Sequence, residues 1–290
     1  MPATELSGIG YLSADTNLAF AVQPGPVLAY AARTHQDPRE LILKMGVPSR
    51  VLDPLLNLGI TLDQIDHIAA GTCLGDAAAE IRFTLVLTLR SAPTDEADLL
   101  RRLRARPQPK GRGLTDVQFG DFPMTLVRVS PTVWVFGADA KKDLDAVTKG
   151  GHGTGCKHLP ASLFQMIAKE VPQDAAAWVA TSDERWAEKP GVRLLIETIL
   201  KKPEWLDAIK QGRAGMVAVS VDENPRLRIV VKTADADSAE RLGAFLAKRA
   251  GGDEKIQQGT TGETVFFDTP IDPAKAFLTV EQLLGGIRKQ

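Results

Sequence analysis

A glycine-rich segment near the middle of the chain carries the residues best suited to chemistry. Glycines recur at every second position from Gly151 to Gly155, and Lys157 follows. Backbone amides of glycine loops and a nearby lysine can bind phosphate. The spacing differs from that of a GxxxxGK[ST] phosphate loop, and no buried strand leads directly into the segment. A plain flexible connector is therefore the favoured interpretation, with phosphate binding as an alternative.

The same segment brings three potential metal ligands together. His152, Cys156 and His158 fall within seven residues of one another. Imidazole and thiolate are donors that zinc prefers, but a structural zinc site needs four ligands, and no fourth is evident nearby. Metal binding at these three residues is a second alternative to the connector, and no resident cofactor is predicted.

Five further residues are candidates for contact with a ligand. His67 stands alone in a predicted strand, while two other strands carry Arg82 and Arg90, and Arg228 and Lys232, on their polar faces. RNA-recognition sheets stack bases on aromatic side chains, and these faces carry none. The basic faces are thus expected to be mostly solvated or to meet a partner, and a lone histidine is more often structural than catalytic.

Strict alternation identifies the strands that carry these arginines. Apolar residues occupy every second position of residues 81–90 and of residues 226–232. This period of two predicts antiparallel strands with one buried face and one mostly solvated face. The apolar sets are Ile81, Phe83, Leu85, Leu87 and Leu89 in the first strand, and Leu227, Ile229 and Val231 in the second.

The two strands belong to segments that resemble each other in order. In each, a turn with an aspartate, Asp15 or Asp174, comes close before a strand, and a leucine-striped helix, 94–103 or 237–246, follows the alternating strand. The order predicts an α+β protein of two diverged ferredoxin-like (split βαβ) repeats, with antiparallel sheets, helices on one sheet face and pseudo-twofold symmetry. The expected domains are residues 1–147, a glycine-rich linker at 148–158, and residues 159–290.

Composition excludes several classes of protein. The chain has 290 residues, 44% of them hydrophobic, and a net charge of -1, so no global field favours nucleic acid or anionic membranes. Two cysteines, Cys73 and Cys156, do not make a disulfide scaffold. No apolar run reaches the ~18 residues of a membrane span, and no signal peptide is visible.

The openings Leu12-Ser-Ala-Asp15 and Val171-Pro-Gln-Asp174-Ala resemble those of uncharacterised duplicated proteins of planctomycete bacteria. That resemblance implies export or association with the cell envelope, whereas a cytoplasmic location is expected without it. It carries over no catalytic residue. Because no catalytic motif is present, we expect a non-enzymatic binding or protein-interaction module. The alternative is a small-molecule-binding or enzymatic cavity between the repeats, as in dimeric α+β barrels, with His67 as the first residue to line it. The partner is expected to be another protein or a small ligand.

Overall fold

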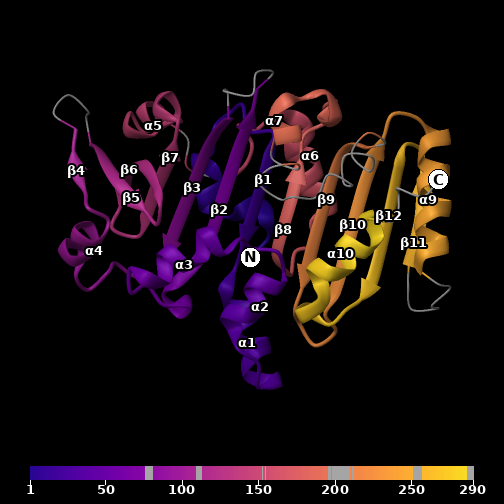
Figure 1. Ribbon diagram of the computed structural model, residues 1–290, viewed down its shortest axis with the longest axis horizontal. Helices are drawn as coiled ribbons and strands as arrows, with labels where there is room; N and C mark the ends of the chain where they lie inside the picture. Colours follow the sequence, from indigo (N-terminus) through magenta and orange to yellow (C-terminus); the bar gives the residue numbers. More distant parts are fainter. Residues whose placement is uncertain are drawn as a thin grey trace.

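Twelve strands form one continuous sheet in the computed structural model, and every neighbouring pair is antiparallel (Figure 1). Their order is β11-β12-β10-β9-β8-β1-β2-β3-β7-β6-β5-β4. The structure describes the following residues: 1–75, 81–108, 113–151, 153, 155–194, 197, 210, 212–250 and 257–285.

The first half of the chain supplies one side of the sheet. Its strands are β1 (Leu18–Val22), β2 (Ile65–Leu74), β3 (Ile81–Leu89), β4 (Arg106–Pro107), β5 (Leu114–Phe119), β6 (Phe122–Ser130) and β7 (Val133–Ala138). Its helices are α1 (Pro24–Thr34), α2 (Pro38–Lys44), α3 (Ser49–Asn57), α4 (Glu96–Arg102) and α5 (Lys141–Thr148). Short 3-10 turns, η1 (Ala3–Glu5) and η2 (Ser7–Tyr11), precede β1, and η3 (Leu62–Gln64) precedes β2.

The second half supplies the other side. Its strands are β8 (Ala175–Thr181), β9 (Gly212–Ser220), β10 (Arg226–Thr233), β11 (Gln257–Thr261) and β12 (Thr264–Pro270). Its helices are α6 (Ala161–Glu170), α7 (Pro190–Leu194), α9 (Ala236–Ala250) and α10 (Ala276–Gly285), with 3-10 turns η4 (Trp186–Glu188) and η6 (Pro273–Lys275).

The two halves meet through β1 and β8 at the centre of the sheet. Leu18 pairs with Thr181 and Val22 with Ala177, so that Phe20 faces Val179 at the midpoint. The shift along the chain that takes Asp15 to Asp174 also takes Leu18 to Ala177. The pairing is therefore self-complementary under that shift, as at a twofold interface between two copies.

The strand order differs from the ferredoxin-like arrangement that the sequence predicts. A split βαβ unit needs two parallel strands with a third between them, whereas β1 and β2 are adjacent and antiparallel. A split crossover does occur later in each half, because β3 and β6 flank β7, and β10 and β11 flank β12. The α+β class and the antiparallel sheet are confirmed, but each half begins as a meander.

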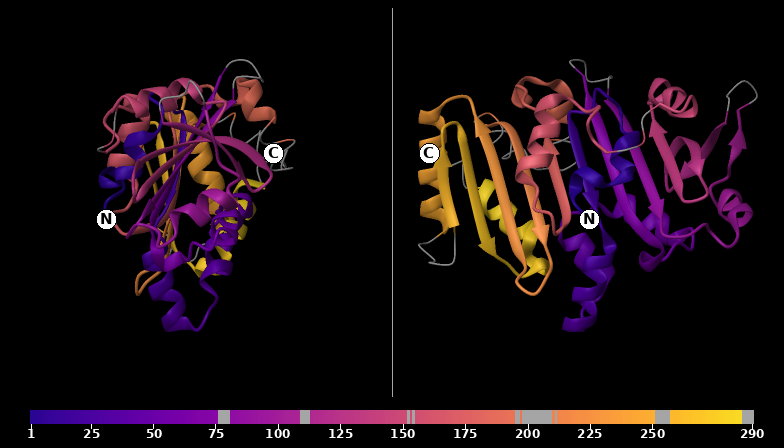
Figure 2. Two further views of the ribbon diagram at one scale, coloured as in Figure 1. Left: turned by 90° about the vertical axis from the view of Figure 1, so that its left-hand side faces the viewer. Right: turned by 180° about the vertical axis from the view of Figure 1, so that it is seen from behind.

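Helices and turns cover both faces of the sheet, which corrects the expectation of one covered face (Figure 2). One core cluster contains residues of α1–α4, α9 and α10, and the other contains residues of η1, η2, α5 and α6. The predicted solvated face of β3 is consequently closed at its centre, where Thr84 and Thr88 are only 3% and 8% exposed. Alternation found the strand correctly, but it could not show that the second face has a cover of its own.

The predicted linker at 148–158 lies between α5 and α6, and the strands on its two sides belong to the same sheet. Within the described part of the chain, no helix is both long enough and apolar enough to cross a membrane.

Candidate functional site

A cavity lies where the segment before β1 meets the segment before β8. Its volume is about 560 Å³, within the range of about 300–1,000 Å³ typical of ligand sites. The turns η1 and η2 form one wall. The other wall consists of α6 and residues 155–157 of the predicted glycine-rich linker, called the connector below. Seen from behind, the N-terminal segment and α6 lie side by side (Figure 2). The lining residues are Thr4, Glu5, Ser7, Gly155, Cys156, Lys157, Phe164 and Ala168.

Glycines allow the connector to approach the N-terminal turns closely. Gly153 and Gly155 have φ angles of 143° and 70°, in the region that favours glycine. A Cβ at Gly153 would lie 2.9 Å from the Tyr11 hydroxyl, and one at Gly155 would lie 2.9 Å from the Thr4 carbonyl oxygen. These glycines therefore allow close packing beside the cavity, whereas the sequence favours a flexible connector.

The cavity wall is mostly apolar, and none of its described residues is an activated nucleophile. Phe164 and Ala168 come from one side of α6, while Leu163 and Ile167 of the same helix enter the core. Burial raises the pKa of the Cys156 thiol, which keeps it protonated at neutral pH. The polar lining residues of the cavity are Thr4, Glu5, Ser7 and Lys157. This chemistry suits retention of a small amphipathic molecule better than covalent catalysis.

The proposed metal ligands do not form a described cluster. His152 lies outside the described residues. Cys156 is buried, and His158 Nε2 lies 2.9 Å from the carbonyl oxygen of Leu12, to which it donates. Across the described ranges, no group of three or more His, Cys, Asp or Glu side chains could hold a metal ion.

His67 belongs to the core rather than to a cavity. Its side chain is 1% exposed, and its Nε2 accepts a hydrogen bond from the Gly8 backbone nitrogen at 2.9 Å. Nε2 must then be unprotonated, so Nδ1 carries the proton and donates to Asp66 Oδ2 at 2.7 Å. Burial lowers the pKa of His67, although the Asp66 carboxylate opposes this shift. With both ring nitrogens engaged, His67 fastens η2 to β2 and lines none of the described cavities, contrary to its predicted ligand role.

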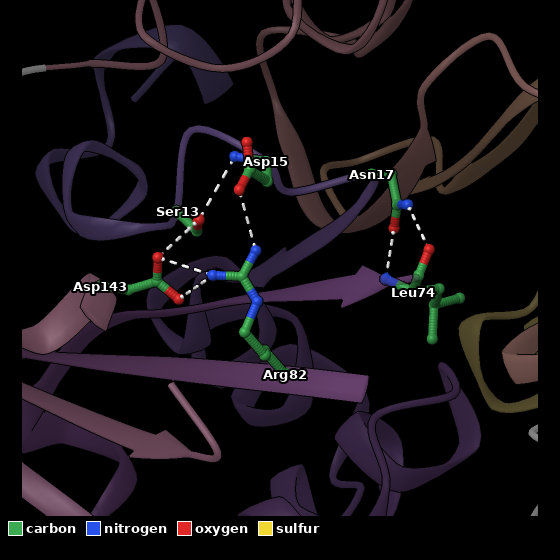
Figure 3. Close-up of polar contacts among 6 residues, drawn as sticks. All are labelled: Ser13, Asp15, Asn17, Leu74, Arg82 and Asp143. Carbon is green, nitrogen blue, oxygen red and sulfur yellow. Dashed lines mark hydrogen bonds and ion pairs between the residues drawn. The ribbon is translucent and has the colours of Figure 1, made fainter. Parts of the chain in front are cut away.

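Arg82 joins three segments in a polar cluster at the start of β3 (Figure 3). Its guanidinium Nη1 contacts both carboxylate oxygens of Asp143 at 2.8 and 2.9 Å, and its Nη2 contacts Asp15 Oδ2 at 2.9 Å. Ser13 donates to Asp143 Oδ1 at 2.9 Å. The cluster ties the turn before β1 to β3 and α5, which leaves Arg82 occupied by protein carboxylates.

Asn17 makes a second connection nearby. Its side-chain amide donates to the carbonyl oxygen of Leu74 and accepts from the backbone nitrogen of Leu74, both at 3.0 Å (Figure 3). This paired contact adds a link between a side chain and the backbone at the end of the β1–β2 ladder. The turn that contains Asp15 therefore has a structural role, as expected for a turn directly before a strand.

The remaining predicted ligand residues are dispersed over the sheet. Arg90 Nε contacts the carbonyl oxygen of Ile65 at 3.4 Å, and Arg228 Nη2 contacts Glu170 Oε2 at 3.0 Å. Lys232 Nζ donates to Asp183 Oδ2 at 2.6 Å. Burial opposes the ionisation of Asp183, but Lys232 and Arg213 outweigh it and hold its pKa below the ordinary value. The structure does not bring these cations together into one site.

Sequence reasoning identified the connector with Cys156 but missed the rest of the cavity wall. Thr4, Glu5 and Ser7 lie in 3-10 turns, which have no long apolar period, and Phe164 and Ala168 are ordinary members of a helix. The one available signal was the density of glycines, which can mark close approach as well as flexibility.

Comparisons with known proteins support the fold alone. No protein-family model and no curated protein matches the chain. The fold is similar to that of the solved structure of TP0453 in its crystal form I, with a TM-score of 0.54 and 12% sequence identity. The match covers 97% of this chain and 99% of that one, so the likeness extends over the whole sheet rather than one half.

Proposed function

We propose that this protein is a non-enzymatic binding protein, and that the cavity between η1–η2 and α6 holds a small amphipathic ligand. The observation that carries the proposal is a mostly apolar cavity of about 560 Å³, whose polar lining residues are Thr4, Glu5, Ser7 and Lys157. Its cysteine is protonated, and His67 lies in the core, away from this cavity. The wall therefore favours binding over turnover.

Two features of the sheet support an origin in a duplicated α+β unit. The self-complementary β1–β8 pairing and the split crossover in both halves are the features expected of two related units. The cavity then lies between the segments that precede the first strand of each unit. A ligand would contact both halves at once and stabilise their junction. The envelope location implied by the resemblance to planctomycete proteins remains a prediction.

The probe 8-anilinonaphthalene-1-sulfonate tests the site, because it is a small amphipathic anion whose fluorescence rises in apolar surroundings. We expect saturable binding at one site per chain in the folded protein. Ala168→Trp fills the cavity and should weaken the affinity by about tenfold or more.

Ala29→Trp is the matched control. Ala29 is exposed on α1, and α1 packs in the core cluster on the other face of the sheet. This control should leave the affinity unchanged. Melting curves of both variants must stay cooperative, so that a loosened fold is not mistaken for a site. Equal binding by the two variants would contradict the proposal.

A further inference from the structure

The two ends of the sheet are built differently. At one end β4 has only two residues, the charged Arg106 and Pro107, which lacks a backbone N–H. At the other end β11 has five residues, Gln257–Thr261, none of them charged and none proline. Short length, charge and proline are the usual means of preventing an edge strand from pairing with another chain. The β4 edge uses all three, whereas β11 uses none.

The hairpin between β11 and β12 determines which backbone groups face outward. Thr261 pairs with Thr264 across a two-residue turn, in which Gly262 has a φ of 57°. In such a ladder every second residue forms a hydrogen-bonded pair with the opposite strand. In β11 these residues are Thr261, Gly259 and Gln257. The N–H and C=O groups of Gln258 and Thr260 therefore point away from β12.

A small groove lies beside this edge, between α9 and the hairpin. Its volume is about 260 Å³, below the size typical of sites for whole small molecules. Leu246 and Val265 form an apolar floor, and the helix wall consists of Gly243, Ala244 and Ala247. A Cβ at Gly243 would lie 2.8 Å from Thr260 Oγ1, so the side chain of Thr260 faces α9.

We propose that β11 accepts an extended segment of a partner protein as a thirteenth strand, with one apolar side chain of that segment in the groove. A residue paired opposite Thr260 directs its side chain to the same face of the sheet, toward α9. Backbone hydrogen bonds to Gln258 and Thr260 supply affinity, and the groove supplies selectivity, as in other recognition by strand addition. None of the described residues that line the groove is charged, which favours an uncharged partner segment.

A second copy of this chain is a poorer occupant than a partner segment. Two β11 strands paired about a twofold axis would offer each groove only glutamine, glycine or threonine. None of these side chains matches the apolar floor of Leu246 and Val265. This surface is also independent of the cavity between η1–η2 and α6, with which it shares no lining residue.

Fluorescence anisotropy with the full chain tests the proposal. The probe is a fluorescein-labelled peptide of alternating threonine and valine, and its comparison peptide has serine in place of valine. We expect the valine peptide to bind at least about fivefold more tightly. Thr260→Pro should weaken binding by about tenfold, because it removes an outward N–H but no bond to β12.

Ala244→Leu should weaken binding by a similar factor by filling the groove, and it tests the proposal even if the proline variant misfolds. Ala236→Leu, on an exposed position of the same helix outside the groove, is the matched control and should bind as the wild type does. No binding of the valine peptide, or equal binding by Ala244→Leu and Ala236→Leu, would overturn the proposal. A concentration-dependent dimer that Thr260→Pro abolishes would overturn it in favour of a second copy.

Discussion

Nε2 of His67 accepts a hydrogen bond from the backbone N–H of Gly8 at a distance of 2.9 Å. The contact joins residues 59 positions apart and lies in the interior, between η2 and β2. It is a neutral bond that depends on one protonation state of the imidazole, since protonated Nε2 would be a donor facing another donor. The attachment of the N-terminal turns, and with them one wall of the cavity, therefore depends on His67.

Replacing His67 with alanine should destabilise the protein. The change leaves the buried Gly8 N–H without an acceptor, which costs about 1–3 kcal/mol, and adds the loss of packing around the ring. Urea unfolding of wild type and variant measures the difference. His35→Asn is a suitable control, because His35 is exposed with a φ of 55° that asparagine tolerates well. A His67 variant as stable as this control would contradict the structural role.

The stability of the protein should fall as the pH decreases below the ordinary histidine pKa of 6.5. Burial lowers the pKa of His67 in the folded state, so the unfolded chain binds the proton more readily. The stability that neutral His67 contributes is present in full above pH 6.5. It is lost as the pH falls toward the lower pKa that His67 has in the folded state. Asp183, whose pKa is also lowered, acts in a more acidic range, below about pH 4.

Free energies of unfolding measured at intervals between pH 7.5 and pH 5 test this expectation. The slope should be smaller in His67→Gln, which can still offer an acceptor oxygen to Gly8 but does not titrate. The same slope in both proteins would show that other groups govern the pH dependence.

Gly8→Ala should be destabilising from the other side of the same contact. A Cβ at Gly8 would lie 2.7 Å from His67 Nε2, which is closer than van der Waals contact allows. The ring cannot move without losing its bond to Asp66. Gly215→Ala is the control, because the nearest atom to its Cβ would be the Val230 carbonyl oxygen at 3.6 Å. Thermal melting should show a clear loss for Gly8→Ala and little change or a gain for Gly215→Ala.

Local periodicity predicted the strands well but could not predict their neighbours. Alternation located 81–90 and 226–232 as strands, because each pairs with strands whose apolar residues share its face. The order of strands depends on which distant segments pair, and β1 pairs directly with β2 instead of leaving room between them. No local pattern distinguishes that outcome from the ferredoxin-like order.

The candidate sites were less predictable than the strands, for a related reason. Arg82 and His67 have the residue types of ligand-binding groups, but distant partners, Asp143 and Gly8, occupy them. The edge strand β11 was not predicted at all, since Gln257–Thr261 has neither apolar alternation nor β-branched residues before Thr260. What converts such segments into structure or site is the packing of elements far away in the chain.

The ion pair between Arg82 and Asp143 should contribute measurably to stability, unlike exposed pairs elsewhere in the chain. The Asp143 side chain is only 14% exposed and receives Arg82 Nη1 and the Ser13 hydroxyl. Asp143→Asn removes the charge but keeps the shape, and should cost about 1.5–3 kcal/mol, the range for hydrogen bonds to charged groups. Asp53→Asn is the matched control, because its pair with Arg39 is 37% and 47% exposed and should contribute less than about 1 kcal/mol. Unfolding in low and high salt separates the two further, since salt screens the exposed pair more strongly. Equal effects of the two substitutions would mean that the Arg82 cluster does not hold α5 against the turn before β1.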